Sequence, residues 1–514
     1  MPSSEMSLPS SSTWAFDASV RAPVPAARSR MRSPGCGATA LRRAVIHTRS
    51  KPPVISASIT SYREARESNI EAISSGSLFR SARGDSVMRQ YSHVFQRTAA
   101  PAPTMEPMHN DFGCSRLVFR ALVLPPQHPG STCSLTSLLP DSGGAAWLGE
   151  RRQMIGLGRA LTLESATPGA IADVRRWEAA PASSCVEGAP SPVLFASFAF
   201  RSPARSVAFV PALALIDEAG ARWAITAGIG DAPDPLAAVD AAVAEARPSP
   251  RAPESLTFGH GSMSRTQWRD SVRAMAQRLR DGAADKAVMA RDMTVRCAHG
   301  FDERFLLERL SDLYPSTWRF CVDSLVGASP EMLIAASGGT ASSRVLAGTC
   351  KPGEGEMLAS SQKDLREHDL ASKSVSSILT QLCTSVTTQG PFLLSLPNVV
   401  HLATDVHARL GSAHLLDLVA ALHPTAAVCG TPRDAAMRLI EQLEDTERGR
   451  YSAPVGWVDT AGDGEFAIAL RCGLTSGTRL RLFAGAGIMP DSDPDAELAE
   501  TEAKMRPLLD ALGV

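Results

Sequence analysis

The sequence predicts an α/β protein, and three observations along the chain support this. From about residue 115 onward, apolar segments with strand periodicity alternate with amphipathic segments of helical periodicity. Residues 1–104 instead are rich in Ser, Pro, Ala and Arg and show little periodicity. The Pro-rich segment ARPSPRAPES at 246–255 is typical of a linker. We therefore expect an N-terminal half at 105–250 and a C-terminal half at 257–514, whose strands can share one sheet.

The first 104 residues are expected to be a disordered extension without a packed core. They hold fourteen Lys and Arg against six Asp and Glu. An Arg- and Ser-rich, acid-poor leader also fits an organellar transit peptide, which stays open as an alternative. Lys occurs at only six positions of the whole chain, and this excess of Arg is typical of a GC-rich bacterial genome. The composition favours an upstream extension or a mis-assigned start, with the folded protein beginning near Met105 or Met108.

The overall composition excludes several classes of protein. With 514 residues, 44% of them hydrophobic, and a net charge of -1, the chain is ordinary for a globular protein and does not indicate a nucleic-acid binder. The ten cysteines form no CxxC pair or Cys/His cluster, so neither a disulfide framework nor a zinc site is expected. The apolar runs are shorter than the roughly 20 residues of a membrane span. We therefore expect a soluble, cytoplasmic protein. A nucleotide cofactor is not expected, because the sequence has no phosphate-binding glycine loop.

The elements follow from the periodicity of each segment. In the N-terminal half, β-branched and aromatic residues predict strands at 116–124, 193–200, 206–216 and 222–229. In the C-terminal half we expect the helices 265–282, 361–384, 433–444 and 495–512, a strand pair at 286–295 and 319–327, and strands at 465–474 and 479–487.

Two of the predicted helices carry rows of acidic residues. Glu497, Glu500 and Lys504 lie at i, i+3 and i+7, on one side of the last helix. In the helix at 361–384, Asp364 and Glu367 form a second row, with His368 beside them. Two such rows can converge on a hard divalent cation such as Mg²⁺. The alternative for the last helix is a solvated charged face with an internal pair between Glu500 and Lys504.

Lys286 and Glu331 are candidates for proton transfer. Lys286 opens a predicted buried strand, where a desolvated amine can serve as a general base. Glu331 follows a Ser-Pro turn and enters an apolar strand, where burial would raise the pKa of its carboxyl and let it serve as an acid. The alternatives are a strand-edge Lys286 paired with Asp285 or Asp302, and an exposed Glu331 that closes the turn.

The segment HPTAAVCGTPRD at 423–434 combines two signals. Thr431 as N-cap, Pro432 at the first helical position and Asp434 three residues after the cap predict a helix start. The small apolar residues before it fit either a tight packing corner or the wall of a pocket.

Ten short segments of the C-terminal half then point to a family. In chain order they are DKAVMAR, GASPE, LAGT, KDLREH, HLAT, HPTAAVCGTPRDAA, RGRYSAPVGW, IALRCGL, RLFAGAGI and AELAETEAK. Together they resemble the chorismate-utilising enzymes, and within them the isochorismate synthases. The resemblance covers 257–514 and is weaker over 115–250, where GERRQMIGLGRA is the recognisable part. It implies a large two-domain α/β (α+β) fold with an extended, mostly antiparallel sheet flanked by helices, and a Mg²⁺-dependent monomer that acts on chorismate.

The resemblance also implies roles for individual residues. Lys286 resembles the base that activates water for attack at C2 of the chorismate ring, and Glu331 the acid that protonates the departing C4 hydroxyl. Glu367 and Glu500 resemble the principal magnesium carboxylates, with Asp364 and Glu497 as outer partners. His401 is expected beside the ring as a catalytic residue. The substrate-binding residues implied are Gly348, Thr349, Ala427, Tyr451, Arg471, the glycine turn Gly485, Ala486 and Gly487, and Lys504.

Several alternatives remain within the resemblance. A salicylate synthase would continue from isochorismate with pyruvate elimination, and an inactive homologue would act only as a binding partner. Relatives that form salicylate or anthranilate often carry Thr where this chain has Ala427, which favours isochorismate as the product. The chain departs from the family at Ala426, where Pro is common, and at Ser452 and Ala453, where glycines are common. Menaquinone and siderophore synthesis both use isochorismate, and the sequence does not choose between them.

Overall fold

The computed structural model describes residues 117–150, 152–167, 169–175, 189–246, 249–396 and 399–514. The predictions about residues 1–104 fall outside these ranges. The described residues belong to one compact unit that ends at Val514. None of their helices is both long and apolar enough to cross a membrane.

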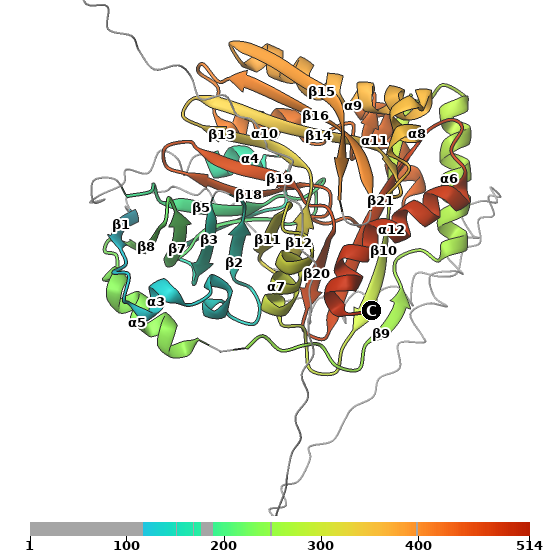
Figure 1. Cartoon of the computed structure of the whole chain (residues 1–514). Coiled ribbons are helices and arrows are strands. Elements are labelled where there is room, and N and C mark those ends of the chain that lie inside the picture. The colour runs from blue at the N-terminus through green and yellow to red at the C-terminus, as the bar shows by residue number, and fades with distance from the viewer. Residues whose placement is uncertain (1–116, 151, 168, 176–188, 247–248, 397–398) are drawn as a thin grey trace, which may run out of the picture. The chain divides into compact units, whose positions relative to one another are not determined.

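The strands form two sheets, in which neighbouring strands pair antiparallel (Figure 1). The larger sheet has twelve strands. Their order is β1 (Leu117–Val123), β8 (Ala221–Ile229), β7 (Leu213–Glu218), β3 (Gln153–Leu157), β2 (Ala145–Leu148), β11 (Trp318–Val322), β12 (Leu325–Ser329), β20 (Cys472–Ser476), β21 (Arg479–Ile488), β10 (Lys286–Arg296) and β17 (Gly430–Thr431), with β9 (Thr257–His260) paired to β10.

The smaller sheet has nine strands and shares a hydrophobic core with the larger one. Its order is β15 (Ser385–Ser395), β16 (Val400–Arg409), β14 (Thr340–Cys350), β13 (Met332–Ser337), β19 (Gly464–Ile468), β18 (Pro454–Asp459), β5 (Val193–Ser197), β6 (Ser206–Val210) and β4 (Leu161–Ser165). Fully buried aromatic residues of both sheets, such as Trp147, Phe320 and Phe466, belong to this common core. Strands from both halves of the chain therefore build both sheets.

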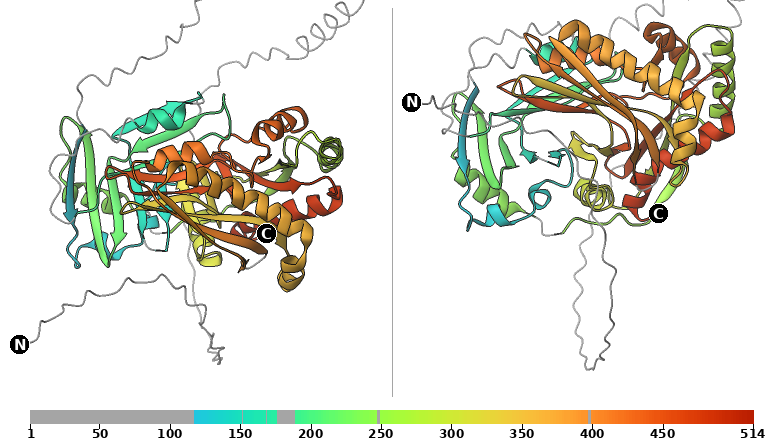
Figure 2. Two further views of the ribbon diagram at one scale, coloured as in Figure 1. Left: turned by 90° about the horizontal axis from the view of Figure 1, so that it is seen from above. Right: turned by 45° about the horizontal axis from the view of Figure 1, so that its top comes forward.

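Helices pack against each sheet. Against the larger sheet lie α7 (Glu303–Leu313), α12 (Pro494–Leu512), α6 (Arg265–Arg280), α11 (Arg433–Leu443) and α5 (Pro235–Glu245). Helices α9 (Gln362–Leu382), α10 (Leu415–Leu422) and α8 (Gly355–Ser360) pack against the smaller sheet, and Figure 2 shows the orange α9 running along its strands. The short helical segments are α3 (Pro129–Thr132), η1 (Leu135–Leu138) and α4 (Ala170–Arg175).

Three predicted strands are each two strands in the structure. The segment 206–216 divides at Pro211 into β6 and β7, which belong to different sheets. The segment 465–474 divides in the same way into β19 and β20. The segment 319–327 is the hairpin β11–β12, because Asp323 and Ser324 adopt φ values of 49° and 68° and turn the chain back. Apolar periodicity marks a buried strand, but it does not say where the chain changes sheets.

Other predictions on local structure also need correction. Strands β10 and β11 are not neighbours in the sheet, so the predicted strand pair is wrong, and helix α7 is not among the predicted elements. Helix α11 begins at Arg433, and its N-cap is Pro432 rather than the predicted Thr431. Thr431 belongs to β17 and pairs with Lys286 of β10. The predicted glycine turn at 485–487 is extended backbone within β21.

Candidate active site

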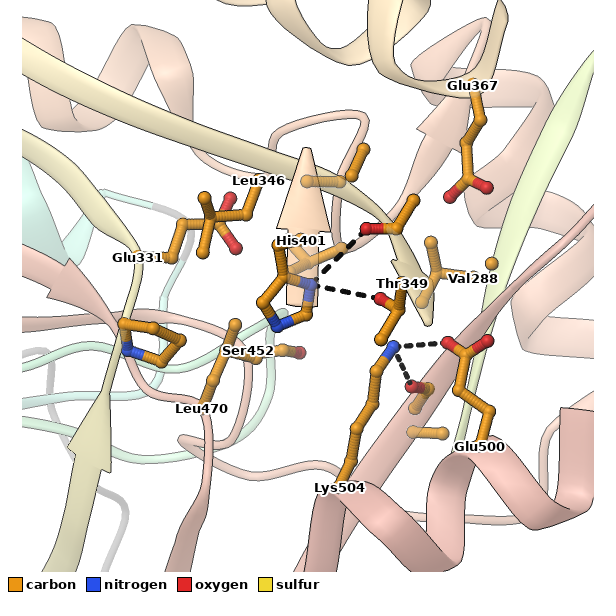
Figure 3. A pocket seen from close by; sticks show the side chains of 18 of the residues that line it. Val288, Glu331, Leu346, Thr349, Glu367, His401, Ser452, Leu470, Glu500 and Lys504 are labelled. Carbon is orange, nitrogen blue, oxygen red and sulfur yellow. Dashed lines mark hydrogen bonds and ion pairs between the residues drawn. The ribbon is translucent and has the colours of Figure 1, made fainter. Parts of the chain in front are cut away.

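One pocket collects almost all of the predicted site residues. Its wall combines β10 and β21 of the larger sheet, β14 and β16 of the smaller sheet, the first turns of α9 and one side of α12. Figure 3 shows the carboxylates of Glu367 and Glu500 directed into it from opposite sides, with His401 and Thr349 between them and Glu331. All lining residues come from the segment between Lys286 and Lys504. The pocket therefore belongs entirely to the C-terminal half.

Glu331 and Arg471 lie at neighbouring points where the chain passes from one sheet to the other. Glu331 follows β12 and precedes β13, and Arg471 lies between β19 and β20. The Ile468 amide donates to the Glu331 carbonyl at 3.1 Å, and the Ala328 amide donates to the Arg471 carbonyl at 3.2 Å. Since both side chains project from backbone that is tied down in this way, their positions are set by the sheets themselves.

Glu331 has the properties of a general acid. It is only 5% exposed, so the alternative of an exposed, turn-closing residue is wrong. Burial raises the pKa of its carboxyl from 4.5 to about 7, although the Leu346 amide and the charges of Lys286 and Arg471 oppose the shift. A carboxyl with this pKa carries its proton in a large fraction of molecules near neutral pH, as proton donation to a leaving group requires.

His401 lies between Arg471 and the Gly348–Thr349 segment of the pocket wall. Arg471 Nη2 donates to His401 Nε2 at 3.2 Å, while His401 Nδ1 lies 3.0 Å from Thr349 Oγ1 and 3.4 Å from the Gly348 carbonyl oxygen (Figure 3). Burial and the nearby charges of Arg471 and Lys504 hold the pKa of His401 well below 6.5, so its ring is neutral. With Nε2 as acceptor, Nδ1 carries the hydrogen. This geometry fits a residue that orients Arg471 and Thr349.

Two glycines are required by this geometry. Gly348 adopts φ 79° at a bulge in β14, where the pairing with β16 shifts between Ala347 and Thr349. At Gly487, a Cβ atom would lie 2.7 Å from Glu367 Oε1 and 2.9 Å from Lys286 Cε. Any side chain at this position of β21 would displace Lys286 from its place in the pocket.

Lys286 is buried at the start of β10 and paired within the pocket. It is 1% exposed, and its Nζ donates to Glu367 Oε1 at 2.8 Å. Its partner is thus neither Asp285 nor Asp302, the two residues proposed as alternatives from the sequence. The amine and the predicted magnesium carboxylate are direct neighbours.

The two acidic rows meet in the pocket, as their spacing predicts. Asp364 and Glu367 come from α9, and Glu497 and Glu500 from α12. The internal pair expected as an alternative also exists: Lys504 Nζ donates to Glu500 Oε1 at 2.5 Å and to the Gly485 carbonyl at 3.2 Å. The ion pair between Glu500 and Lys504 is therefore compatible with the convergence of the two acidic rows, because both residues of the pair line the pocket.

The carboxylates suit a divalent cation in their chemistry. Burial, followed by the charge of Glu500, raises the pKa of Glu497 to about 7, and its Oε1 accepts from Ser492 Oγ at 2.6 Å. Such crowding of acids is relieved by a hard cation with oxygen ligands, the type of site Mg²⁺ occupies. As the side chains stand, no three acidic, His or Cys residues of the described ranges surround one point, since Glu367 and Glu500 face ammonium groups. The donor atoms are carboxylate oxygens, the ligand type that Mg²⁺ prefers.

His368, although it shares the row of Asp364 and Glu367, does not face the pocket. It is 2% exposed, with Nδ1 3.2 Å from the Ala347 carbonyl oxygen and Nε2 2.7 Å from Thr404 Oγ1. It joins α9 to the smaller sheet and is not placed as a metal ligand.

Tyr451 and Ala427 line the pocket, whereas Ala486 does not. Tyr451 stacks on Phe483 with ring centroids 5.1 Å apart, and burial raises the pKa of its hydroxyl. Ala427 lies in the short turn after Thr425, so the segment before α11 is both a tight corner and a pocket wall. Ala486 is fully buried in the hydrophobic core, because alternate residues of β21 face opposite sides. The side chain of Ala486 therefore does not line the pocket, and a substrate contact through its backbone stays a prediction.

Arg448 and Glu444 are pocket-supporting residues that the sequence reasoning missed. Arg448 donates to both carboxylate oxygens of Glu444 at 2.7 Å and to the carbonyls of Val288 and Val428 at 2.7 and 2.8 Å. Glu444 accepts from the Ala290 amide at 2.6 Å. Together they satisfy backbone groups of Val288 and Ala290 in β10, beyond the two residues that pair with β17. Arg448 opens the segment RGRYSAPVGW, but the resemblance gave it no role.

Comparisons with known proteins find a matching family and similar chains. A family model described as "Chorismate binding enzyme" matches residues 147–513. Isochorismate synthase MenF of Bacillus subtilis (strain 168) is 35% identical over 265 residues, which cover 49% of this chain and 56% of the relative. The chain thus aligns with little more than half of that relative's length. Isochorismate synthase DhbC of the same organism is 35% identical over 269 residues, covering 48% of this chain and 68% of the relative.

Among solved structures, the fold matches that of MenF, the menaquinone-specific isochorismate synthase from Escherichia coli. The TM-score is 0.67 at 22% sequence identity, and the match covers 77% of this chain and 95% of that chain. At this identity the likeness concerns the fold alone. It agrees with the predicted class of large antiparallel sheets flanked by helices.

Proposed function

The chain belongs to the chorismate binding enzyme family, and from this premise we propose that it converts chorismate into isochorismate. The observation that carries the proposal is the polarity of the pocket. The basic residue Lys286 lies beside Glu367 at one end, and the protonatable Glu331 lies at the other, across His401 and Thr349 (Figure 3). The two relatives reported above bear the name of this activity.

In the proposed reaction, water adds at C2 of the ring while the C4 hydroxyl leaves, and both double bonds of the ring diene shift by one position, from C1=C2 and C5=C6 to C1=C6 and C4=C5. Lys286 removes a proton from the attacking water, and Glu331 supplies a proton to the departing hydroxyl, which leaves as water. Such an exchange needs a base and an acid on different sides of the substrate, and this pocket has one at each end. Thr349 and the Gly348 backbone lie between them, where they can contact the C4 hydroxyl.

Chorismate carries two carboxylates, which a buried pocket must neutralise. Arg471 is 8% exposed, and its guanidinium stays charged although burial lowers its pKa. It is suited to bidentate binding of one carboxylate, with Tyr451 and Lys504 beside it. On the side of the pocket formed by α9 and α12, Glu367 and Glu500 would hold Mg²⁺, with Asp364 and Glu497 as outer partners. The bound ion would supply positive charge between these acids and the second substrate carboxylate.

Ala427 supports isochorismate as the final product. Its methyl group lines the pocket and can neither donate nor accept a hydrogen bond, whereas a Thr hydroxyl there could do both. Salicylate formation, the alternative, requires a second step that eliminates pyruvate. The pocket offers no additional polar group at this position for that step.

Product analysis tests the proposal directly. The full chain is incubated with chorismate and Mg²⁺, and the products are separated and identified by mass. We expect isochorismate without pyruvate. Salicylate with an equal amount of pyruvate would assign the chain to the alternative activity, and unchanged chorismate would refute both.

A further inference from the structure

Non-glycine residues with left-handed backbone are few and fall into two groups. Among the described residues there are six. Three of them, Ala219, Asp323 and Ser324, lie in turns between strands, and Ser255 is the last residue of the Pro-rich segment 246–255. The other two, Ser452 at φ 58° and Arg471 at φ 47°, line the pocket. Such conformations are strained for residues with a Cβ, and they persist where the surroundings enforce them. Arg471 already has a role as the carboxylate-binding cation, whereas Ser452 has none.

Backbone hydrogen bonds explain the left-handed conformation of Ser452, but they do not explain why this position carries a side chain. The Ser452 amide donates to the Ala469 carbonyl at 2.9 Å, and the Ala469 amide donates to the Ala453 carbonyl at 2.8 Å. These bonds fasten the segment to the crossing between β19 and β20, next to Arg471. Glycine would make the same backbone bonds without strain. The backbone bonds therefore do not require a side chain at this position, and the hydroxyl is the polar group that serine adds to the pocket.

The Ser452 hydroxyl can still donate one hydrogen bond. Ser452 is 2% exposed and lines the pocket, and its Oγ accepts from Arg448 Nη1 at 3.3 Å. The oxygen is thereby used as an acceptor, which leaves its own hydrogen to be donated. Across the described residues, Arg448 is the only hydrogen-bond partner of this oxygen. A buried donor beside a cationic guanidinium, facing a pocket, is well suited to an anionic ligand.

We propose that Ser452 Oγ donates a hydrogen bond to a carboxylate oxygen of the bound substrate, as an additional binding residue next to Arg471. This inference rests on the proposed function, because it requires chorismate or a similarly charged dicarboxylate in the pocket. The hydroxyl contributes equally to the bound substrate and to the transition state, since the carboxylates do not react. Its loss should therefore act on KM and leave kcat nearly unchanged.

The test compares three variants of the full chain. Ser452→Gly removes the hydroxyl and the backbone strain, and Ser452→Ala removes the hydroxyl but keeps the strain. Ser255→Gly is the matched control, because Ser255 has φ 54° and is exposed outside the pocket. Steady-state kinetics with chorismate and thermal unfolding are measured for each. We expect both Ser452 variants to raise KM about tenfold, the loss typical of one hydrogen bond to a charged group, with kcat within about twofold.

The two possible roles of the hydroxyl give different results. If Ser452 served only to anchor Arg448, both Ser452 variants would unfold at lower temperature and keep the KM of wild type, and the proposal would be overturned. A KM effect that also occurred in Ser255→Gly would overturn it as well, since it would report strain alone. If the wild-type chain did not convert chorismate, the proposed function itself would fail, which separates that outcome from a failure of the Ser452 inference.

Discussion

The two ends of the pocket place their charged groups by different means. At the acid end, formed by Glu331, Arg471 and His401, the first two side chains project from points where the chain changes sheets, and His401 projects from β16 of the smaller sheet. At the carboxylate end, formed by Asp364, Glu367, Glu497 and Glu500, they project from the faces of α9 and α12. Glu331 and Arg471 at the acid end are buried, whereas at the carboxylate end the side chains of Glu367 and Glu500 are 14% and 29% exposed and that of Glu497 is 7% exposed.

This difference separates two electrostatic tasks. Dry surroundings at the acid end shift the pKa of Glu331 to about 7 and keep His401 neutral, so that end can hold and release a proton. At the carboxylate end, Glu367 and Glu500 pair with the ammonium groups of Lys286 and Lys504, while burial and the charge of Glu500 raise the pKa of Glu497 to about 7. The proposed acid and the proposed base thus lie at different ends of one pocket, with the base beside the carboxylates.

The strongest test of the comparison removes the proposed acid at one end of the pocket and the proposed base at the other. Glu331→Gln keeps the shape of the side chain but cannot supply a proton, and Lys286→Ala removes the proposed base. We expect each to lower kcat by about a thousandfold, the range of general acid or base catalysis. The measurement is single-turnover conversion of chorismate at saturating Mg²⁺.

A matched control for this test is Glu441→Gln. The Glu441 side chain is 52% exposed on α11 and pairs with Arg201 outside the pocket. It should retain wild-type turnover. Near-normal activity of Glu331→Gln would remove the acid end from proton transfer, and circular dichroism would establish that an inactive variant is folded.

A second prediction concerns stability, again at the acid end. Because burial raises the Glu331 pKa from 4.5 to about 7, the folded state binds this proton more tightly than the unfolded chain. The stabilisation is fully present below about pH 4.5 and is lost as pH rises through about 7. Above that pH the buried charge costs wild type about 3 kcal/mol, at about 1.4 kcal/mol for each pH unit between the two pKa values.

Glu331→Gln carries no such charge. Urea unfolding should therefore show it more stable than wild type by up to about 3 kcal/mol at pH 8.5, with a much smaller difference at pH 4.5. In Glu441→Gln the difference from wild type should not change with pH. If Glu331→Gln paralleled wild type across this range, the carboxyl would not be buried with its proton, and the contrast between the two ends would disappear.

The sequence predicted the carboxylate end better than the acid end, for a physical reason. A helix places residues i, i+3 and i+7 on one side whatever surrounds it, so the rows of Asp364, Glu367, Glu497 and Glu500 could be derived from spacing. The position of Arg471 depends on a left-handed residue between two strands of different sheets. The apolar periodicity of the sequence runs without a break through Arg471, as it does through Pro211. It therefore predicted one strand at each place where the structure has two.

The side-chain directions on β21 show a second limit. Gly485 and Gly487 line the pocket while Ala486 faces the core, which follows from the alternation of any strand once the segment is known to be extended. The family resemblance presented these residues as a turn, which hid the alternation. The Glu444–Arg448 support was not predicted because its function lies in bonds to the backbone of β10, and these have no signature in sequence spacing.

The smallest predicted effect concerns the carboxylate end, and it decides whether the two ends are separate. Glu367→Gln and Glu500→Gln each remove one negative charge from the proposed Mg²⁺ site and leave Glu331 intact. We expect the Mg²⁺ concentration for half-maximal activity to rise about tenfold, because a weakened ligand set binds the ion less tightly, while excess Mg²⁺ restores part of the turnover.

Asp369→Asn is the control, since Asp369 pairs with Lys373 on the exposed side of α9. Unchanged Mg²⁺ dependence would remove these carboxylates from the metal site. A loss of turnover that excess Mg²⁺ cannot restore would show that Glu367 or Glu500 takes part in the proton transfer itself, so that both ends of the pocket share one task.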